Sequence, residues 1–572
     1  MMNLTEKLAN IWKIIKNQPK DIWFFYLFLL TFTLGVRKVV LYFPVKRTFN
    51  EYAGVYVYAS DIFLCSTILV WIMTILYNKI TKTSSRNYAS AGLIHKIDHA
   101  ESVDNSPTHN LSTGEKGLIK ATIYYFRAML LGLIIISLFD HYLWDIWQGQ
   151  VLFWLVCGIL VGIASLNCST WNNSKYANTK KCSTWNNLKQ FSIFLIPLAL
   201  VVWSFISIAW SENQLIGFYR SARFLELYGL FVYVPFRFMP YLINCSTWNN
   251  SMVENSEIVP RGTINIFGAF FLIVIFLGVA QSLIGIAQFI VQHSLGLFWL
   301  KESLIGQDIL GVAKIIVNHQ VLIRSYGLFP HPNILGGFLF FTIVVTLLYQ
   351  KLFHPEESTI VPRGTIVDHG ADAEQIKEHD NVKCSTWNNF KQAWKNVPPA
   401  YRTGRRGTIW LNSIKLVLVV QVIGLFLSFS KSAIFALVVA LVYIIVPRGT
   451  NFREKIKKLF HVEQFRNLVV LVGVAFLVLY FTGVQFYALF FKSLAERMLY
   501  LGISIQMISA NPLIGVGTGQ FTLVSARLFP NLEIWQYQPV HNVFLLIWSE
   551  WGIVGLVLFI VFLWKLFHVE QS

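Results

Sequence analysis

Charge is scarce in this chain. Only 13% of its 572 residues are charged, whereas 55% are hydrophobic and 16% are aromatic. A water-soluble domain carries roughly a quarter charged residues, so this composition excludes an ordinary soluble protein. The alternation of apolar and polar residues that builds a membrane β-barrel is also missing. Helices then remain as the structure that satisfies the backbone in lipid, and we expect an integral membrane protein.

Acidic residues and cysteines are few as well. The chain has 29 Asp and Glu against 47 Lys and Arg, which leaves a formal net charge of +18. Basic loops of membrane proteins face anionic lipid headgroups, so we expect membrane lipids as partners and no nucleic acid. The six cysteines form no CxxC pair and no Cys/His cluster. This pattern predicts no metal, no cofactor and no disulfide framework.

Long apolar runs are abundant. A helix needs about 20 apolar residues to cross a bilayer, and such runs recur along the whole chain. They predict an all-α, polytopic domain, residues 1–572, with about twelve spans, near 22–42, 58–78, 119–139, 149–166, 191–210, 224–243, 264–291, 333–351, 412–429, 431–446, 467–485 and 541–563. Residues 1–21 are too polar and too long for the leader of a cleavable signal peptide, so we expect the first span to remain as an anchor.

The positive charges predict which side of the membrane each loop occupies. Lys7, Lys13, Lys16 and Lys20 place the amino terminus in the cytoplasm, and alternation places the carboxyl terminus there too. The cytoplasmic segments are then 79–118, 167–190, 244–263, 352–411 and 447–466, which read as linkers without a second folded domain. Two large loops, 292–332 and 486–540, and a short basic one, 211–223, lie outside the cytoplasm.

Three short peptides recur: Cys-Ser-Thr-Trp-Asn-Asn, Val-Pro-Arg-Gly-Thr and Phe-His-Val-Glu-Gln. Their copies are at 168–173, 182–187, 245–250 and 384–389, at 259–263, 361–365 and 446–450, and at 460–464 and 567–571. The palindrome TGTTCCACGTGGAACA encodes all three in its three reading frames, so we infer that a DNA element has spread into the gene. All copies fall at or within predicted cytoplasmic segments, where the fold tolerates insertion. The large outer loops, free of copies, are where we expect the functional site.

The first outer loop ends in polar residues beside the membrane. Arg324 is a fixed cation that suits a phosphate. Pro330 and Pro332 bracket His331, and Asn333 can cap the following helix; the same residues also fit a rigid helix start with no ligand. Lys431, in the turn Ser430-Lys431-Ser432, either faces the same outer cavity as Arg324 or extends to the lipid interface.

The second outer loop carries the other candidates. Residues 492–509 show helical spacing of apolar residues, with Arg497 on another face, and predict an amphipathic helix in the interface. A glycine-rich turn follows at 511–519 but lacks the Gly-Lys-Ser/Thr of a Walker A loop. His541 and Asn542 stand at the start of the last span. His541 fits a catalytic base or a structural hydrogen-bonding group, and the convergence of Arg497 and Arg324 on this face favours the base. Arg220 and Arg223 end the short loop.

Taken together, these residues resemble the bacterial O-antigen ligase and O-antigen polymerase-like glycosyltransferases. The resemblance rests on Tyr58-Ala59-Ser60-Asp61, Arg324 with Gly327-Leu328-Phe329 and Pro332-Asn333, Ser430-Lys431-Ser432, Arg497 with Asn511-Pro512-Leu513 and Gly515-Val516-Gly517, and His541-Asn542 with Glu550-Trp551-Gly552. It implies a GT-C-like, metal-independent enzyme of the bacterial plasma membrane. Such an enzyme takes a glycan from an undecaprenyl-diphosphate carrier to a glycan, lipid or protein acceptor at the outer face.

The resemblance also implies roles for the residues. Arg497 and Arg324 would bind the diphosphate, and His541 would act as the base. Lys431 stands where relatives often have arginine, so it keeps the charge without the bidentate geometry. Arg220, Arg223, His331, Asn333 and Asn542 remain further candidates. The main rival interpretation is a transporter or flippase of lipid-linked oligosaccharides, but the spans carry few central charges, which favours chemistry at one surface over alternating access.

Overall fold

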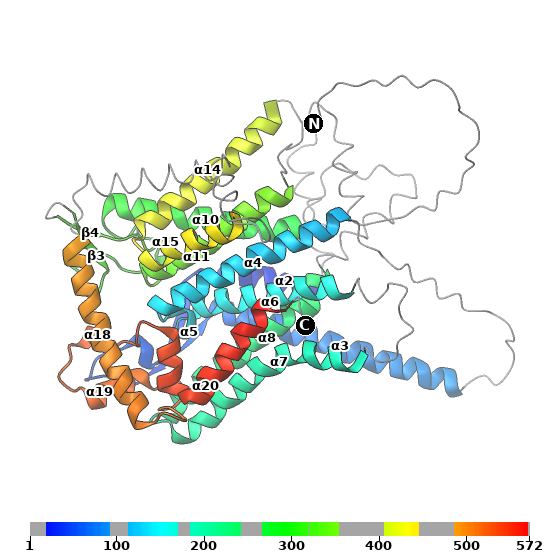
Figure 1. The fold of residues 1–572 in the computed structure, drawn as a ribbon, viewed down its shortest axis with the longest axis horizontal. Coiled ribbons are helices and arrows are strands. Elements are labelled where there is room, and N and C mark those ends of the chain that lie inside the picture. The colour runs from blue at the N-terminus through cyan, green and yellow to red at the C-terminus, as the bar shows by residue number, and fades with distance from the viewer. Residues whose placement is uncertain are drawn as a thin grey trace, which may run out of the picture.

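The computed structural model describes residues 19–91, 113–169, 183–241, 266–317, 320–353, 405–445 and 486–569. The structure is mostly helical, as predicted, but it is not purely helical. Two small antiparallel sheets are present, β1(Arg37–Tyr42) with β2(Gly54–Tyr58) and β3(Lys314–Val317) with β4(Gln320–Ile323). Each sheet is a single pair of short strands in a connection between helices (Figure 1).

Seven helices in the described part of the chain are long and apolar enough to cross a membrane. Their spanning segments are Ala59–Thr81, Ile119–Phe139, Trp147–Ser165, Ser192–Trp210, Phe270–Val291, Pro332–Leu352 and Val543–Phe567. Each of these segments overlaps a predicted span, and most of its ends lie within a few residues of the predicted ends. Two further predicted spans are shorter apolar helices, Ser413–Leu427 and Lys431–Ile444. The expected total of about twelve stays a prediction, because 467–485 lies outside the described residues.

Two predicted spans differ from the structure. The first, 22–42, is only half helical: α2(Lys20–Thr31) stops early, and Arg37–Tyr42 forms strand β1. Its β-branched and aromatic residues pair with β2, in a register that sets Arg37 opposite Tyr58. In the second case, α8(Gln214–Tyr233) begins ten residues before the predicted span 224–243. The predicted loop 211–223 is therefore largely helix, started by an Asn213 side chain that accepts from the Ile216 amide.

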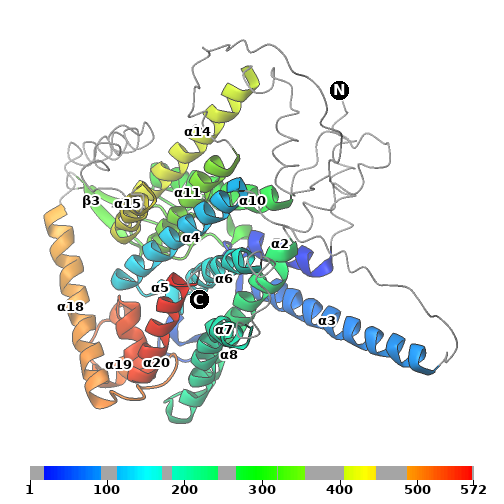
Figure 2. The same ribbon diagram turned by 45° about the vertical axis from the view of Figure 1, so that its right-hand side comes forward.

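The core is made of long helices that pack side by side. The central ones are α4(Thr113–Phe139), α6(Trp147–Ser169) and α11(Pro332–Phe353); the others around them are α3(Ala59–Ala91), α7(Ser183–Ile206), α8, α10(Ile266–Val291), α14(Arg405–Leu427), α15(Lys431–Ile445) and α20(Val543–Phe567). The α6 and α11 spans are almost wholly buried. At Gly132 of α4, an added Cβ would lie 2.2 Å from Cζ of Phe340, so glycine permits close approach to α11. Helix α3 projects away from the other helices (Figure 2).

Remaining elements lie in connections at one end of the bundle, which we call the site end. They include η1(Glu51–Ala53), α5(Tyr142–Asp145), η2(Ser207–Trp210), η4(Phe298–Leu300), α18(Phe486–Ala510), α19(Phe521–Leu528) and η5(Ile534–Gln536). Helix α18 runs across this end (Figure 1). It contains the helix predicted at 492–509, and its Leu494, Met498 and Ile505 are exposed.

The opposite end carries most of the helix ends that adjoin segments outside the described residues; α18, at the site end, begins next to such a segment as well. At the opposite end the Lys565 ammonium donates to Ser192 Oγ over 3.0 Å, and Arg237 pairs with Asp21 at 2.7 Å. Every repeated peptide lies outside the described residues or at the very end of α6, α7 or α20. Which end faces the cytoplasm stays a prediction.

Candidate functional site

Arg324 is held where three elements of the site end meet. It follows β4, and its guanidinium donates from Nε to the Ser428 carbonyl at 2.7 Å and from Nη2 to Asn333 Oδ1 at 2.6 Å. Burial lowers the pKa of Arg324 to about 10, so the side chain stays cationic at neutral pH. The hydrogen bonds come from the turn before α15 and from the first turn of α11. Tertiary packing thereby fixes this cation in place.

Asn333 connects Arg324 to a carboxylate that the sequence did not single out. Its Nδ2 donates to Asp140 Oδ2 at 2.6 Å while its Oδ1 accepts from Arg324. The expected helix-capping role falls instead to His331, whose Nδ1 accepts from the Asn333 amide at 3.2 Å. Burial, with the nearby Arg324 charge, lowers the pKa of His331 to about 3. His331 is therefore a neutral cap, and Asn333 is a bridge between two charges.

His541 lies beside this network, just before α20. Its ring stacks on Tyr500 of α18, with centroids 5.1 Å apart and planes 15° apart, and lies 4.9 Å from the ring of His141. Nδ1 of His541 is buried and has no hydrogen-bond partner among the described residues. Burial, followed by the charge on His141, lowers the pKa of His541 to about 4. At neutral pH this imidazole is uncharged and able to accept a proton.

His141 has the opposite environment. Its Nδ1 lies 2.9 and 3.0 Å from the two carboxylate oxygens of Asp145, and its backbone amide donates to Asp140 Oδ1 at 2.9 Å. Burial acts against the charged ring, but Asp145 and Asp140 raise the pKa of His141 above its ordinary value. Burial likewise acts against the Asp140 carboxylate, yet the surrounding histidines and the Asn333 amide lower its pKa. Two neighbouring imidazoles with pKa values driven apart are typical of paired acid and base groups.

Two more predicted cations face this cluster. Arg497 of α18 donates from Nη1 to the Phe139 carbonyl at 2.7 Å. Lys431 is exposed at the start of α15, close enough to Arg324 and Arg497 for their charges to act on it. We call Arg324, Lys431, Arg497 and His541, with Asp140, His141, Asp145 and Asn333, the histidine cluster. Because the cluster contains three cations, it suits an anion.

The other candidates have structural partners. Asn542 caps α20, accepting from the Leu545 amide at 3.0 Å, and donates to the Leu138 carbonyl at 3.0 Å. Arg223 is buried and paired with Asp61 at 2.8 Å. Its guanidinium lies 4.4 Å from the centroid of the Trp147 ring. Because Arg223 is already neutralised, it offers less to an incoming anion than Arg324 does.

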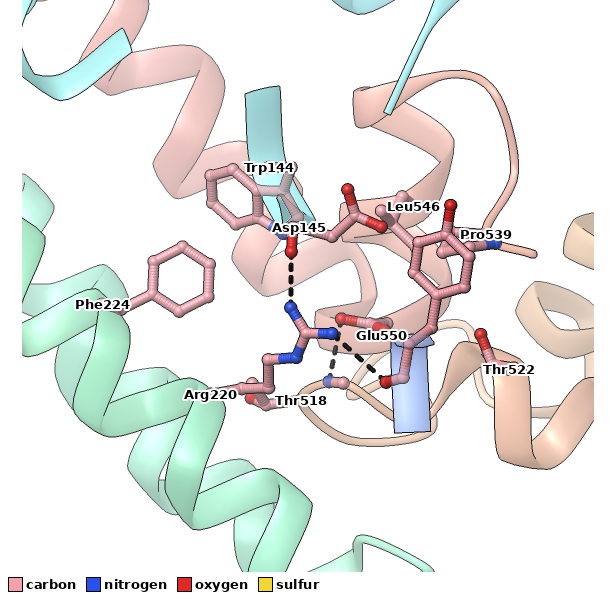
Figure 3. A pocket seen from close by; sticks show the side chains of 11 residues that line it. Trp144, Asp145, Arg220, Phe224, Thr518, Thr522, Pro539, Leu546 and Glu550 are labelled. Carbon is pink, nitrogen blue, oxygen red and sulfur yellow. Dashed lines mark hydrogen bonds between the residues drawn. The ribbon is translucent and has the colours of Figure 1, made fainter. Parts of the chain in front are cut away.

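Arg220 lines a pocket beside the histidine cluster (Figure 3). It donates to the Asp145 carbonyl at 2.6 Å and to the Tyr52 carbonyl at 3.2 Å. Asp145 thus contacts His141 on one side and this pocket on the other. The three cavities described for this structure are lined by other residues than Arg324, Arg497 and His541.

The glycine-rich turn at 511–519 packs against α20. Amides of Val516 and Gly517 donate to the carbonyls of Ser549 and Glu550, at 2.9 Å each. Gly552 of α20, with a φ of 65°, packs directly against the turn, because an added Cβ would lie 2.1 Å from the Leu513 carbonyl oxygen. These amides are therefore engaged within the protein. The turn fixes the direction of α20 and, with it, the position of His541.

The described residues contain no group of three or more His, Cys, Asp or Glu arranged to hold a metal ion. No curated protein and no solved structure matches the chain. Residues 416–560, about a quarter of the chain, match the family model described as O-antigen ligase. The matched segment includes Lys431, Arg497 and His541, whereas Arg324 and residues 140–145 precede it. This match supports the resemblance to an O-antigen ligase-like family that was inferred from the sequence.

Proposed function

We propose that this chain transfers or polymerises a glycan from an undecaprenyl-diphosphate carrier to an acceptor at the outer face of the plasma membrane. The observation that carries the proposal is the neutral, buried imidazole of His541 beside Arg324 and Arg497. A glycosyl diphosphate is already activated, so the enzyme needs a base for the acceptor and cations for the leaving group. The histidine cluster provides both in one place.

The cations have a defined task in this reaction. As the bond between the sugar C1 and the diphosphate oxygen breaks, negative charge grows on the diphosphate. Fixed guanidinium groups stabilise that charge without rearrangement, and removing one such donor costs about 10²–10³ in rate. Arg324 is held by Ser428 and Asn333 before substrate arrives, so it is preorganised for this role. Lys431 adds a third positive charge without the bidentate geometry of an arginine.

His541 has the second task. Its unpartnered Nδ1 can accept the proton of an acceptor hydroxyl while that oxygen attacks C1. Stacking on Tyr500 holds the ring plane, and the imidazolium formed lies beside the carboxylate of Asp140, which acts favourably on a charged His541. Proton, acceptor oxygen and departing diphosphate are then all accounted for by residues of this chain.

Reconstitution in vesicles with an undecaprenyl-diphosphate-linked glycan tests the proposal. We expect His541→Ala, Arg324→Ala and Arg497→Ala each to lower glycan transfer by about 10² or more. Arg527→Ala is the matched control, because Arg527 also lies at the site end but its side chain is 63% exposed and pairs with Glu212 at 3.3 Å. Transfer unchanged in His541→Ala would remove the proposed base. Movement of an intact lipid-linked glycan across the bilayer, without bond cleavage, would instead indicate a transporter.

A further inference from the structure

Three cavities adjoin one another at the site end. The pocket of Figure 3 shares Tyr52, Asp145 and Arg220 with a second cavity, which in turn shares Arg37, Tyr58 and Pro330 with a third. The third cavity has a volume of about 430 Å³, within the usual range for bound organic ligands. We call the three together the cavity row. It begins beside Asp145 and His141 and extends to the connection between α10 and α11.

Two buried polar atoms in the cavity row have no hydrogen-bond partner within the described part of the chain. One is an acceptor, Oε1 of Gln148, whose residue is 3% exposed and lines the third cavity. The other is a donor, Nε of Arg220, in the first two cavities. Buried polar atoms are nearly always paired in native structures, so both point to a missing partner. A ligand that fits both must donate and accept hydrogen bonds, as a hydroxyl group does.

The charges of the cavity row differ from those of the histidine cluster. Four cationic and four acidic residues line the row: Arg37, Arg220, Arg223 and Lys301 against Glu51, Asp145, Glu302 and Glu550. This balance suits an uncharged ligand, whereas the excess of cations around His541 suits a diphosphate. Aromatic rings supply much of the remaining lining, including Tyr52, Trp144, Tyr58, Trp147 and Phe298. Rings offer apolar faces to the C–H faces of sugars, while the charged groups bind hydroxyls.

We propose that the cavity row binds a hydroxyl-rich, uncharged glycan chain and leads it to the histidine cluster. The proposal rests on the proposed function and adds to it where the sugar lies. The glycan has two possible sources, the donor and the acceptor, which share this chemistry. Water is the simpler occupant, but a volume near 430 Å³ exceeds the roughly 30 Å³ share of one water many times over.

Neighbouring aromatic residues give a matched test. Phe298 and Trp299 belong to the same short helix η4 and are both exposed, 68% and 93%, but only Phe298 lines the cavity row. Neither supports the core, so Phe298→Ala and Trp299→Ala should both fold. A second pair compares Gln148→Leu with Gln421→Leu, which makes the same change at a buried glutamine of α14 outside the three cavities. Thermal melting of the purified variants checks folding.

Two measurements distinguish the sources of the glycan. The first is the Kd of glycan-linked undecaprenyl diphosphate divided by the Kd of undecaprenyl diphosphate alone. The second is the KM for the acceptor, measured at a fixed concentration of the donor. If the row holds the donor glycan, Phe298→Ala and Gln148→Leu raise the Kd ratio by about tenfold. If it holds the acceptor, they raise KM about tenfold with little change in kcat. Their controls change neither quantity.

Variants of the row that behave like their controls in both measurements would overturn the inference. That result does not contradict the proposed function, because the loss of transfer in His541→Ala tests that function independently. Conversely, a raised Kd ratio in Phe298→Ala together with full transfer by His541→Ala would keep the glycan site and reject the proposed base.

Discussion

The pH dependence of transfer gives the sharpest test of the role of His541. Burial lowers its pKa to about 4, so the base should stay active in mild acid. With that pKa, roughly nine-tenths of His541 is neutral at pH 5, whereas an ordinary pKa of about 6.5 would leave only about 3% neutral. The rate at pH 5 therefore differs by about thirtyfold between the two cases. We expect kcat/KM to stay nearly constant from pH 7 to pH 5 and to fall near pH 4.

The assay is initial-rate transfer in reconstituted vesicles, with folding checked at each pH by size-exclusion chromatography. A half-maximal rate near pH 6.5 in folded protein would refute the reasoning, because the buried imidazole could not then be the base. Stability offers an independent check. His541 binds its proton more weakly when folded than when unfolded, so stability falls as pH drops below 6.5, by about 2 kcal/mol from pH 7 to pH 5. His541→Gln should lose about that much less over the same interval.

Three further predictions concern charge and backbone. Arg324→Lys should recover only part of the transfer that Arg324→Ala loses, because lysine cannot donate to Ser428 and Asn333 in the same fork; rates of the two variants equal to wild type would contradict this. Asp61→Ala should destabilise the protein by about 3–5 kcal/mol, since it leaves Arg223 buried and less fully paired; an unchanged melting temperature in detergent would argue against the pair. Gly552→Ala should lower the melting temperature and transfer together, because its Cβ would collide with the Leu513 carbonyl; Gly502→Ala, with open space around it, is the control.

Most helices could be predicted because a long run of apolar residues in lipid satisfies its backbone hydrogen bonds by forming a helix. The span at 22–42 shows the limit of that reasoning. Residues 39–42 are apolar and extend the predicted span, yet together with Arg37 and Lys38 they form a strand, because a partner at 54–58 pairs with them. That partner is invisible to a local hydropathy reading. The same holds for α8, whose early start depends on Asn213 and on packing against its neighbours.

Part of the candidate site was predictable and part was not. Arg324, Lys431, Arg497 and His541 were expected on one face of the membrane, and the structure brings them together. Residues 140–145 were missed, although three ionisable side chains in a short connection between two apolar spans were a visible signal. Arg223 shows the opposite error: as a basic residue near a predicted loop it suggested an anion site, but Asp61, far away in the sequence, already neutralises it.

The sequence by itself determined that the chain is a multi-span membrane protein and where most helices lie, because in lipid each helix satisfies its own backbone locally. The tertiary structure decided which histidine is neutral, which has its pKa raised by Asp145, and that Asp61 neutralises Arg223. Those properties depend on burial and on charges brought together from distant parts of the chain, such as the contact between His141 and His541. Electrostatic environments of this kind are set by contacts across the fold, so only the folded chain could reveal them.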